Sequence, residues 1–423
     1  MTSREEAGAK ILETVAALEA VEQPLVKCIG QVPAEDIYSA YDLPQAASSG
    51  PDGYAVKSAD IIPASRENPV LLRIIDSVRA GSLPKKVITH GTAARIMTGS
   101  VVPRGADCVV RFEDTDEPGN KNGPNQCKPT KVKIYIPEAP GANIRTAGCN
   151  SSKGSLVVAK GTVIGPAQIA ALTAHGITML KVIRRPVIAV ISTGDELIRA
   201  GKPLSPGKSY DCNAAALAAL ISHYGGIPKV LGIARDTMRS VEARIGKGLK
   251  ADAIITSGGA SKGDYDLIRL VLGKMGTLIF YTINTGPGAA VAFGLLKRPS
   301  GIAGAASIPL FALAGPTSGC LINFETLVRP ALLRMLGYTN IEHPDVQAEA
   351  LDASPDKKRM AFAKWTTLQK VNGCYQVSLN ASNGMGMFAS LAAANSLTII
   401  PEGCSIEAGD TVQVLPLDWR REG

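Results

Sequence analysis

The sequence is poor in the residues that several common functions need. Aromatic residues make up only 4% of the 423 positions, so stacking surfaces for single-stranded nucleic acid are scarce. The four histidines follow no motif, which argues against a zinc site and against a serine hydrolase; they are His90, His175, His223 and His343. The Lys and Arg residues behind the net charge of +8 form no dense runs. We therefore expect no nucleic-acid partner.

Signals for export, membrane insertion and disulfide bonding are also missing. The eight cysteines form no CxxC pair, and most stand beside apolar residues, as reduced core cysteines do. The first residues are charged and lack the apolar centre of a signal peptide. The most apolar stretch, residues 301–316, contains Pro309 and is shorter than the roughly 18–20 residues that span a bilayer. We expect a cytoplasmic protein without a membrane partner.

The chain is long enough for about two to four domains, and its centre shows the clearest pattern. Two apolar runs, residues 187–191 and 253–255, end abruptly in glycine and hydroxyl residues, as strands buried on both faces of a parallel sheet do. Further strand-like runs at 229–233, 277–283 and 308–313 alternate with expected helices at 213–224, 237–249, from 267 onward, and 318–336. This order predicts a doubly wound α/β domain.

The flanking regions have other patterns. Ser3 and Glu6 form a capping box ahead of apolar residues at helical spacing, which predicts a helix over residues 4–22, followed by a strand over 25–32. Residues 50–140 alternate short Val/Ile runs with Gly and Pro, which is typical of a β module. Strand-like runs after residue 339, with a small-residue segment at 388–394, indicate a small closed β domain.

Carboxylates follow the predicted strands of the central domain. Asp195 and Glu196 follow the first run, Asp236 follows residues 229–233, and Asp264 and Asp266 follow residues 253–255. Ligands of open α/β sheets bind beyond the carboxyl ends of the strands, and Mg²⁺ binds one or two carboxylates together with ligand phosphates. The pattern therefore favours a metal and phosphate site. The alternative is that Asp195 and Asp266 cap the helices that follow them.

The same loops carry groups suited to phosphate. Hydroxyls that can donate to phosphate oxygens, and glycines that expose backbone amides, are Thr193, Gly194, Ser257, Gly258, Gly259 and Ser261. None of these loops is a Walker A loop or a dinucleotide fingerprint, which argues against ordinary kinase or dinucleotide chemistry.

Two other acidic positions are ambiguous. Asp211 and Asn213 flank Cys212 directly before an expected helix, where capping is at least as good an interpretation as a binding site. Asp52 precedes Gly53, and this pair alone is typical of a tight turn.

Eight motifs follow one another in a specific order. They are Asp42-Leu43-Pro44 with Asp52-Gly53-Tyr54-Ala55-Val56, Arg95-Ile96-Met97-Thr98-Gly99, Gly105-Ala106-Asp107-Cys108-Val109-Val110 with Glu113-Asp114, Asn143-Ile144-Arg145, Ser192-Thr193-Gly194-Asp195-Glu196-Leu197, Asp211-Cys212-Asn213, Thr256-Ser257-Gly258-Gly259 with Gly263-Asp264-Tyr265-Asp266, and Ala392-Ala393-Ala394-Asn395 through Gly409-Asp410-Thr411-Val412. Together they resemble the molybdopterin molybdenumtransferase family, which includes bacterial MoeA proteins and the gephyrin E domain of animals. The resemblance covers essentially the whole chain.

The resemblance implies an elongated homodimer with four domains in each subunit. They are an N-terminal and linker domain (residues 1–49 and 141–181), an inserted β domain (50–140), a molybdopterin-binding α/β domain like MogA and MoaB (182–338), and a C-terminal small β-barrel domain (339–423). The fold class is thus multidomain α/β plus β.

The resemblance also implies an activity. Members of the family insert molybdate into adenylylated molybdopterin and release AMP with the molybdenum cofactor, assisted by a divalent metal, usually Mg²⁺. The site lies between the α/β domain of one subunit and the N-terminal and inserted regions of the other. The motifs carry over Asp52, Glu196, Asp236 and Asp266 as catalytic residues, the last three as metal ligands. The expected substrate contacts are Thr98, Thr193, Gly194, Ser257, Gly258, Gly259, Ser261, Lys262 and Asp264.

Four segments depart from the family pattern: residues 46–51, residues 148–150, which lack two usual carboxylates, and two loops that follow sheet strands. Residues 286–290 lack the lysine of a Pro-Gly-Lys-Pro loop, and residues 314–318 replace a Pro-Gly-Asn-Pro loop. Losing the lysine removes a cation where molybdate or phosphate docks, and Lys262 is a candidate replacement. The departures leave two alternatives: a degenerate paralogue that binds molybdopterin without turnover, as a carrier or assembly partner, and a gephyrin-like scaffold. A molybdopterin adenylyltransferase or a molybdoenzyme is a candidate protein partner.

Overall fold

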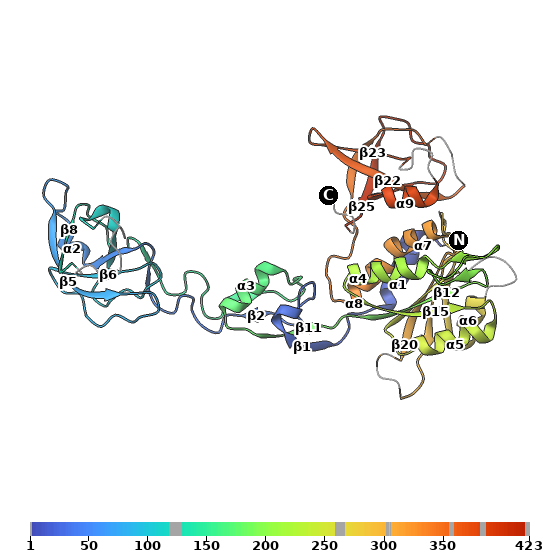
Figure 1. Cartoon of the computed structure of the whole chain (residues 1–423), viewed down its shortest axis with the longest axis horizontal. Coiled ribbons are helices and arrows are strands. Elements are labelled where there is room, and N and C mark those ends of the chain that lie inside the picture. The colour runs from blue at the N-terminus through green and yellow to red at the C-terminus, as the bar shows by residue number, and fades with distance from the viewer. Residues whose placement is uncertain are drawn as a thin grey trace. The chain divides into compact units, whose positions relative to one another are not determined.

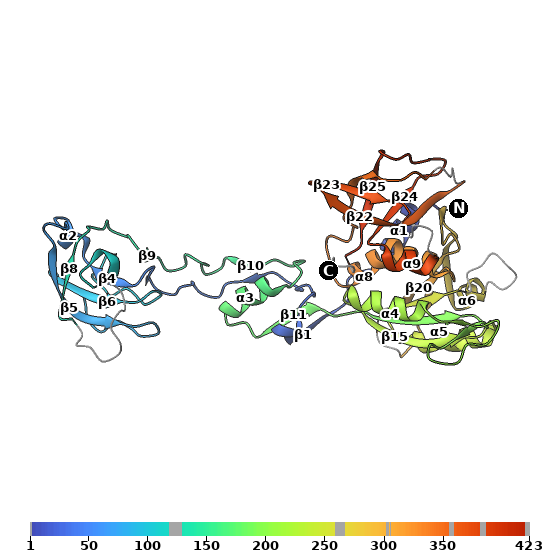
Figure 2. The ribbon, with the colours of Figure 1, turned by 45° about the horizontal axis from the view of Figure 1, so that its top comes forward.

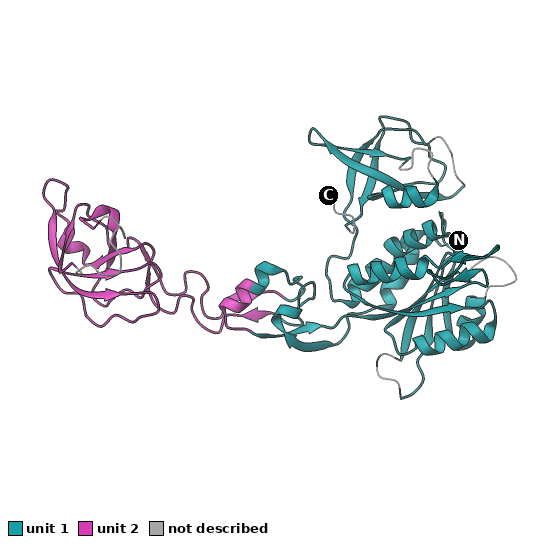
Figure 3. Ribbon diagram, viewed as in Figure 1, with its two compact units in different colours: residues 1–35, 160–169, 178–423 teal, residues 36–159, 170–177 magenta. Residues whose placement is uncertain are grey.

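The fold is described from a computed structural model, whose helices and strands are labelled in Figure 1. The described residues are 2–117, 129–258, 267–301, 304, 306–354, 359–380 and 386–418. The chain forms two compact units (Figure 3): unit 1 comprises residues 1–35, 160–169 and 178–423, and unit 2 comprises residues 36–159 and 170–177.

A six-stranded sheet forms the centre of unit 1. Its strand order is β15 (Ile227–Ala234), β12 (Val187–Thr193), β16 (Ala253–Ser257), β20 (Ser307–Leu313), β19 (Ala292–Lys297) and β17 (Gly276–Tyr281). The first four strands are parallel, and β19 runs antiparallel to both β20 and β17. The two apolar runs that the sequence singles out are thus the neighbouring strands β12 and β16.

Helices cover both faces of this sheet (Figure 1). Ile188 and Val190 of β12 share a core with α1 (Arg4–Thr14), α4 (Asn213–His223), α7 (Thr317–Asn323) and α8 (Arg329–Met335). Ala189 and Ile191 share another with α5 (Met238–Gly248) and α6 (Leu267–Met275). Because successive side chains of a strand point to opposite faces, an unbroken apolar run supplies both cores. The predicted doubly wound α/β domain is confirmed.

The sequence patterns do not reveal strand β19. Its apolar run is interrupted by Gly294, where an added Cβ would overlap the backbone oxygen of Thr277 on β17 and lie 2.7 Å from Leu272 of α6. The glycine allows this close packing. Because it interrupts the run of apolar residues, the sequence pattern does not predict the strand.

The N-terminal prediction is wrong beyond the first helix. Ser3 caps α1 by accepting a hydrogen bond from the Glu6 amide, but the helix ends at Thr14. Residues Ala20–Pro24 form strand β1, which pairs antiparallel with β11 (Met179–Ile183). The expected strand at 25–32 begins instead as a 3₁₀ turn, Leu25–Lys27. Pairing with a strand far away in the sequence overrides the local helical spacing, which is a weak preference.

The helical segment after β20 is continuous but irregular. Helix α7 passes into a π-helical segment, η3 (Phe324–Val328), and then into α8. The predicted helix over 318–336 therefore exists, with a widened turn at its centre. Among the described helices, none is both long and apolar enough to cross a membrane.

A closed barrel forms the C-terminal part of unit 1 (Figure 2). Its strands follow the order β22 (Ala361–Val371), β23 (Cys374–Ser378), β21 (Val346–Ala350), β25 (Thr411–Pro416) and β24 (Ser396–Ile400), and β24 pairs back with β22. Strand β18 (Thr285–Gly286) adds to the start of β22. The small-residue segment contains helix α9 (Met387–Ala393). The predicted C-terminal β-barrel is confirmed.

Unit 2 contains the predicted β module. Its five-stranded sheet has the order β7 (Cys108–Arg111), β4 (Gly53–Val56), β6 (Thr92–Ile96), β5 (Val70–Val78) and β8 (Lys131–Ile134). Its core includes Tyr54, Ile61, Leu72 and Val110. Short pairs join β2 (Ile37–Tyr38) to β10 (Leu156–Val158) and β3 (Ser48–Ser49) to β9 (Ile144–Arg145). Helix α3 (Pro166–Ala174) follows β10.

Candidate functional site at the carboxyl ends of the central strands

Two neighbouring strands, β12 and β15, bring acidic loops to one edge of the central sheet. Strand β12 pairs with β15 on one side and with β16 on the other. Asp195 and Glu196 follow β12, and Asp236 follows β15. The loops touch, since the Asp195 amide donates to Asp236 Oδ2 at 3.1 Å. Glu196 and Asp236 therefore come from adjacent loops of the same edge.

Two cations that sequence reasoning missed lie beside these carboxylates. Arg235 Nη1 donates to the Asp195 backbone oxygen at 3.0 Å and lies 3.7 Å from its carboxylate. Lys208 Nζ donates to the same backbone oxygen at 2.7 Å, and its loop is held by pairing of β13 (Leu197–Ile198) with β14 (Ser209–Tyr210). Arg235 thus lies within ion-pair distance of the Asp195 carboxylate, whereas Lys208 contacts only its backbone oxygen. Arg235 directly precedes Asp236 in the sequence, but Lys208 could be placed here only from the fold.

The ends of β12 and β16 are pressed together at glycines. Gly258 has φ +86°, and a Cβ there would lie 2.6 Å from the Thr193 backbone oxygen. Thr193 Oγ1 donates to the Ser257 backbone oxygen at 3.3 Å. The Glu196 carboxylate lies directly over Gly194. Thr193, Gly194, Ser257 and Gly258 therefore form one continuous loop edge.

Replacing Gly258 by alanine should damage this edge. The left-handed backbone and the overlap with Thr193 together should cost about 2 kcal/mol or more, and the shifted loop should lose activity. Gly246→Ala in α5 is the matched control, because no atom lies within 4 Å of the added Cβ. We expect unfolding free energy and activity to fall for Gly258→Ala only. Equal behaviour of the two variants would contradict the packing described above.

The start of α4 ties three loops together. Asp211 accepts hydrogen bonds from Ser192 Oγ at 2.8 Å and from the Ala214 amide at 3.1 Å, so it acts as a helix cap. Asn213 Nδ2 donates to Ser257 Oγ at 2.6 Å and to the Gly315 backbone oxygen at 2.8 Å. Asp211 therefore caps the helix, while Asn213 links the ends of β16 and β20.

The loop at residues 286–290 is closely packed on α7. A Cβ at Gly319 would lie 2.8 Å from Gly288 Cα, and Asn323 Nδ2 donates to the Gly288 backbone oxygen at 2.9 Å. This loop, which lacks the family's lysine, is fixed by backbone contacts to α7.

In unit 2, Asp52 and Thr98 lie together. Both the amide and the hydroxyl of Thr98 donate to Asp52 Oδ1, at 2.6 and 2.9 Å. Asp52 thus holds the Thr98 loop rather than serving only as a turn residue. The remaining predicted site residues, Gly259, Ser261, Lys262, Asp264 and Asp266, lie outside the described residues.

The described residues provide few metal ligands. Across the described ranges, no group of three or more His, Cys, Asp or Glu side chains could hold a metal ion. Glu196 and Asp236 offer carboxylate oxygens on adjacent loops. Such a donor set fits a hard cation that keeps water and phosphate ligands, as Mg²⁺ does, better than a closed protein cage.

Comparison with known families identifies the class of protein. Family models match in chain order: the MoeA N-terminal region, domains I and II, over residues 2–176; a probable molybdopterin binding domain over residues 189–334; and the MoeA C-terminal region, domain IV, over residues 347–417. The edge described above belongs to the second of these segments. The fold and site thus define a protein of molybdenum cofactor biosynthesis.

Whole-chain relatives make the assignment specific. The molybdopterin molybdenumtransferase of Nostoc sp. is 32% identical over 92% of this chain and 86% of its own length, and that of Bacillus subtilis is 33% identical over 90% and 86%. A crystal structure of a molybdopterin biosynthesis MoeA protein from Pyrococcus horikoshii is 33% identical, with a TM-score of 0.82 over 98% of this chain and 99% of that one. The chain therefore belongs to the MoeA family of molybdopterin molybdenumtransferases, and it is an enzyme of that class.

Proposed function

We propose that the chain uses molybdate and adenylylated molybdopterin to form the molybdenum cofactor, with release of AMP. The observation that carries this proposal is the loop edge of the molybdopterin-binding segment, where the carboxylates of Glu196 and Asp236 lie on adjacent loops beside the cations Arg235 and Lys208. The family's shared enzyme name supports the same activity.

The residues of this edge have distinct roles in the proposal. Thr193 and Ser257 are buried, and the amides of Gly194 and Gly258 donate to backbone oxygens, so these four residues keep the ends of β12 and β16 closely packed beneath the carboxylates. Arg235 and Lys208 supply positive charge that draws an anionic substrate to the edge. Glu196 and Asp236, with Asp266, are the proposed holders of Mg²⁺, which when bound neutralises charge on the phosphoanhydride.

The proposal extends to assembly and location. We propose a homodimer in which Asp52 and Thr98 of one subunit complete the site on the α/β domain of the other. The hydrogen bonds between Asp52 and Thr98 fix the two residues together, which supports the proposal that they act as a pair. A cytoplasmic location and a transient contact with an adenylyltransferase or a molybdoenzyme remain predictions.

Release of AMP tests the activity directly. The purified chain is mixed with adenylylated molybdopterin, molybdate and Mg²⁺, and AMP is separated and quantified over time. We expect release that depends on all three additions. A reaction mixture that forms no AMP, with substrate shown to be intact, would contradict the enzymatic proposal.

One observation favours a second candidate. The loop at 286–290 lacks a lysine, and its Gly288 is fixed against α7. A paralogue that binds molybdopterin without turnover would keep the same edge. Calorimetry that detects binding of adenylylated molybdopterin, together with no AMP formation, would select this carrier role.

A further inference from the structure

A cavity lies at the edge of the central sheet opposite the candidate site. Its volume is about 690 Å³. It is lined by Arg185 just before β12, by Tyr224 at the end of α4, and by His343 in the segment between α8 and β21. Because β12 has seven residues, about 20 Å separates this edge from the candidate active site. The cavity is therefore not part of that site.

Two guanidinium groups line the cavity without a carboxylate partner. Arg329 is only 6% exposed; its Nη1 donates to the Ile341 backbone oxygen at 3.2 Å, and its Nε has no hydrogen-bond partner. Arg185 donates to the backbone oxygens of Gly225 at 3.1 Å and Ile29 at 2.8 Å. Neither arginine forms an ion pair with any residue in the described ranges.

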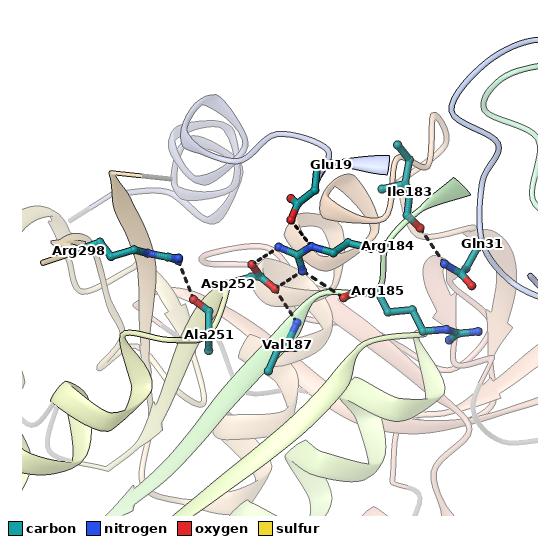
Figure 4. A network of polar contacts seen from close by, with 9 residues as sticks. All are labelled: Glu19, Gln31, Ile183, Arg184, Arg185, Val187, Ala251, Asp252 and Arg298. Carbon is teal, nitrogen blue, oxygen red and sulfur yellow. Dashed lines mark hydrogen bonds and ion pairs between the residues drawn. The ribbon is translucent and has the colours of Figure 1, made fainter. Parts of the chain in front are cut away.

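The neighbouring Arg184, in contrast to Arg185, forms ion pairs with two carboxylates. It donates to both oxygens of Asp252, at 2.6 and 2.7 Å, and to Glu19 at 2.6 Å. Figure 4 shows Arg184 between these two carboxylates, whereas the side chain of Arg185 points away from them. The two consecutive arginines thus differ in charge compensation.

Three carboxylates, those of Glu342, Asp345 and Asp418, also line the cavity, and Glu325 lies behind Tyr224. Glu325 is fully buried, and its Oε2 accepts a hydrogen bond from Tyr224 Oη at 2.9 Å. His343 Nε2 lies 3.1 Å from this Glu325 Oε2 atom. Asp418 Oδ1 lies 2.8 Å from the Tyr224 phenol oxygen, and the single phenol proton can be donated to only one of the two carboxylates at a time. Burial, and then these two carboxylates, raise the pKa of Tyr224 above its ordinary value, so the phenol remains a donor. Glu325 and Asp418 therefore share one donor, the Tyr224 phenol.

The backbone at this place is also unusual. Glu325 lies in the π-helical segment η3, and Arg329 directly follows that segment. Such segments within α-helices are frequent at functional sites. The Arg329 guanidinium lies 5.2 Å from the centre of the Tyr224 ring. The widened turn thus places a charged group in the cavity wall, where an ordinary core helix would have an apolar side chain.

We propose that this cavity binds a small organic anion, whose carboxylate or phosphate group is held by Arg329 and Arg185. A buried guanidinium without an ion-pair partner in direct contact is unfavourable, and an anionic ligand bound between the two arginines supplies one. The planar donor fork of arginine matches both carboxylate and phosphate oxygens. The cavity volume lies within the range of small-molecule sites, about 300–1,000 Å³. The rings of Tyr224 and Tyr338 offer apolar surface for the rest of the ligand.

The test compares full-length wild type with Arg329→Gln and Arg185→Gln. Inorganic phosphate and acetate are titrated separately, at constant ionic strength set with chloride, by calorimetry and by thermal unfolding. Arg334→Gln is the control, because Arg334 lies on the exposed side of the same helix α8 and does not line the cavity. We expect one or both anions to stabilise wild type and the control, with binding at least about tenfold weaker in Arg329→Gln.

The outcomes separate the ligand classes. Stabilisation by phosphate alone assigns a phosphate group, and stabilisation by acetate alone assigns a carboxylate. If Arg329→Gln does not fold, the same loss in Arg185→Gln supports the site. No stabilisation of wild type by either anion, or equal binding by wild type and both cavity variants, overturns the proposal.

Discussion

Asp52→Asn and Glu196→Gln, each made alone, should lower AMP release by at least about 100-fold, because each removes a charge from the proposed catalytic site. The two substitutions are nearly isosteric, and the asparagine oxygen introduced in the first variant can still accept the hydrogen bonds from the Thr98 amide and hydroxyl. The loss should therefore appear in turnover rather than in folding. Initial rates of AMP release, with unfolding curves measured in parallel, check this result.

Coexpression of the two variants should restore activity if the site is shared between subunits. Random pairing makes half of the dimers mixed, and each mixed dimer contains one intact site, so about a quarter of wild-type activity is expected. Glu22→Gln, an exposed charge removal on β1, should leave activity unchanged. Activity of the coexpressed pair that stays at the single-variant level would place both residues in a site within one subunit.

Asp252→Ala should be among the most destabilising single changes in unit 1. The side chain is 11% exposed and accepts two hydrogen bonds from Arg184 and one from the Val187 amide at 2.8 Å. These bonds join the starts of β12 and β16 (Figure 4). Removing the Asp252 carboxylate leaves Arg184 with only one carboxylate partner, the exposed Glu19. We expect the unfolding free energy to fall by roughly 2–4 kcal/mol. Urea unfolding followed by circular dichroism measures the change.

Glu19→Ala is the matched control, because Glu19 binds the same guanidinium from an exposed position. Its side chain is 64% exposed, so the expected loss is below about 1 kcal/mol. The hydrogen bond from Arg184 lowers the pKa of Glu19, so this small contribution is present above the unfolded pKa and disappears as the pH falls through the folded one. Equal losses in the two variants would show that burial does not decide the strength of these pairs.

The parts of the fold that depend on local patterns could be predicted from the sequence. Consecutive apolar residues at 187–191 and 253–255 specify strands with two covered faces, and both are central strands. Capping by Ser3 correctly marks the start of α1. The end of that helix could not be predicted, because β1 is determined by its pairing with β11 rather than by its own spacing.

The site follows the same division. The positions of Asp195, Glu196 and Asp236 after strands are visible in the sequence, and adjacency of the strands brings them together. The resemblance, not the spacing, identified Asp52 as more than a turn residue. Lys208 and Arg329 carry no local signal, since the importance of each depends on groups that only the folded chain brings near.

The two hydrogen-bonded residues of β18 have a consequence for motion. Thr285 and Gly286 lead into the loop that packs on α7, yet they pair with Ala361 and Phe362 of the barrel. A swing of the barrel must either carry this loop along or break its backbone bonds. The C-terminal barrel is thus mechanically coupled to the loop, and amide exchange at residues 285 and 286 would register its displacement.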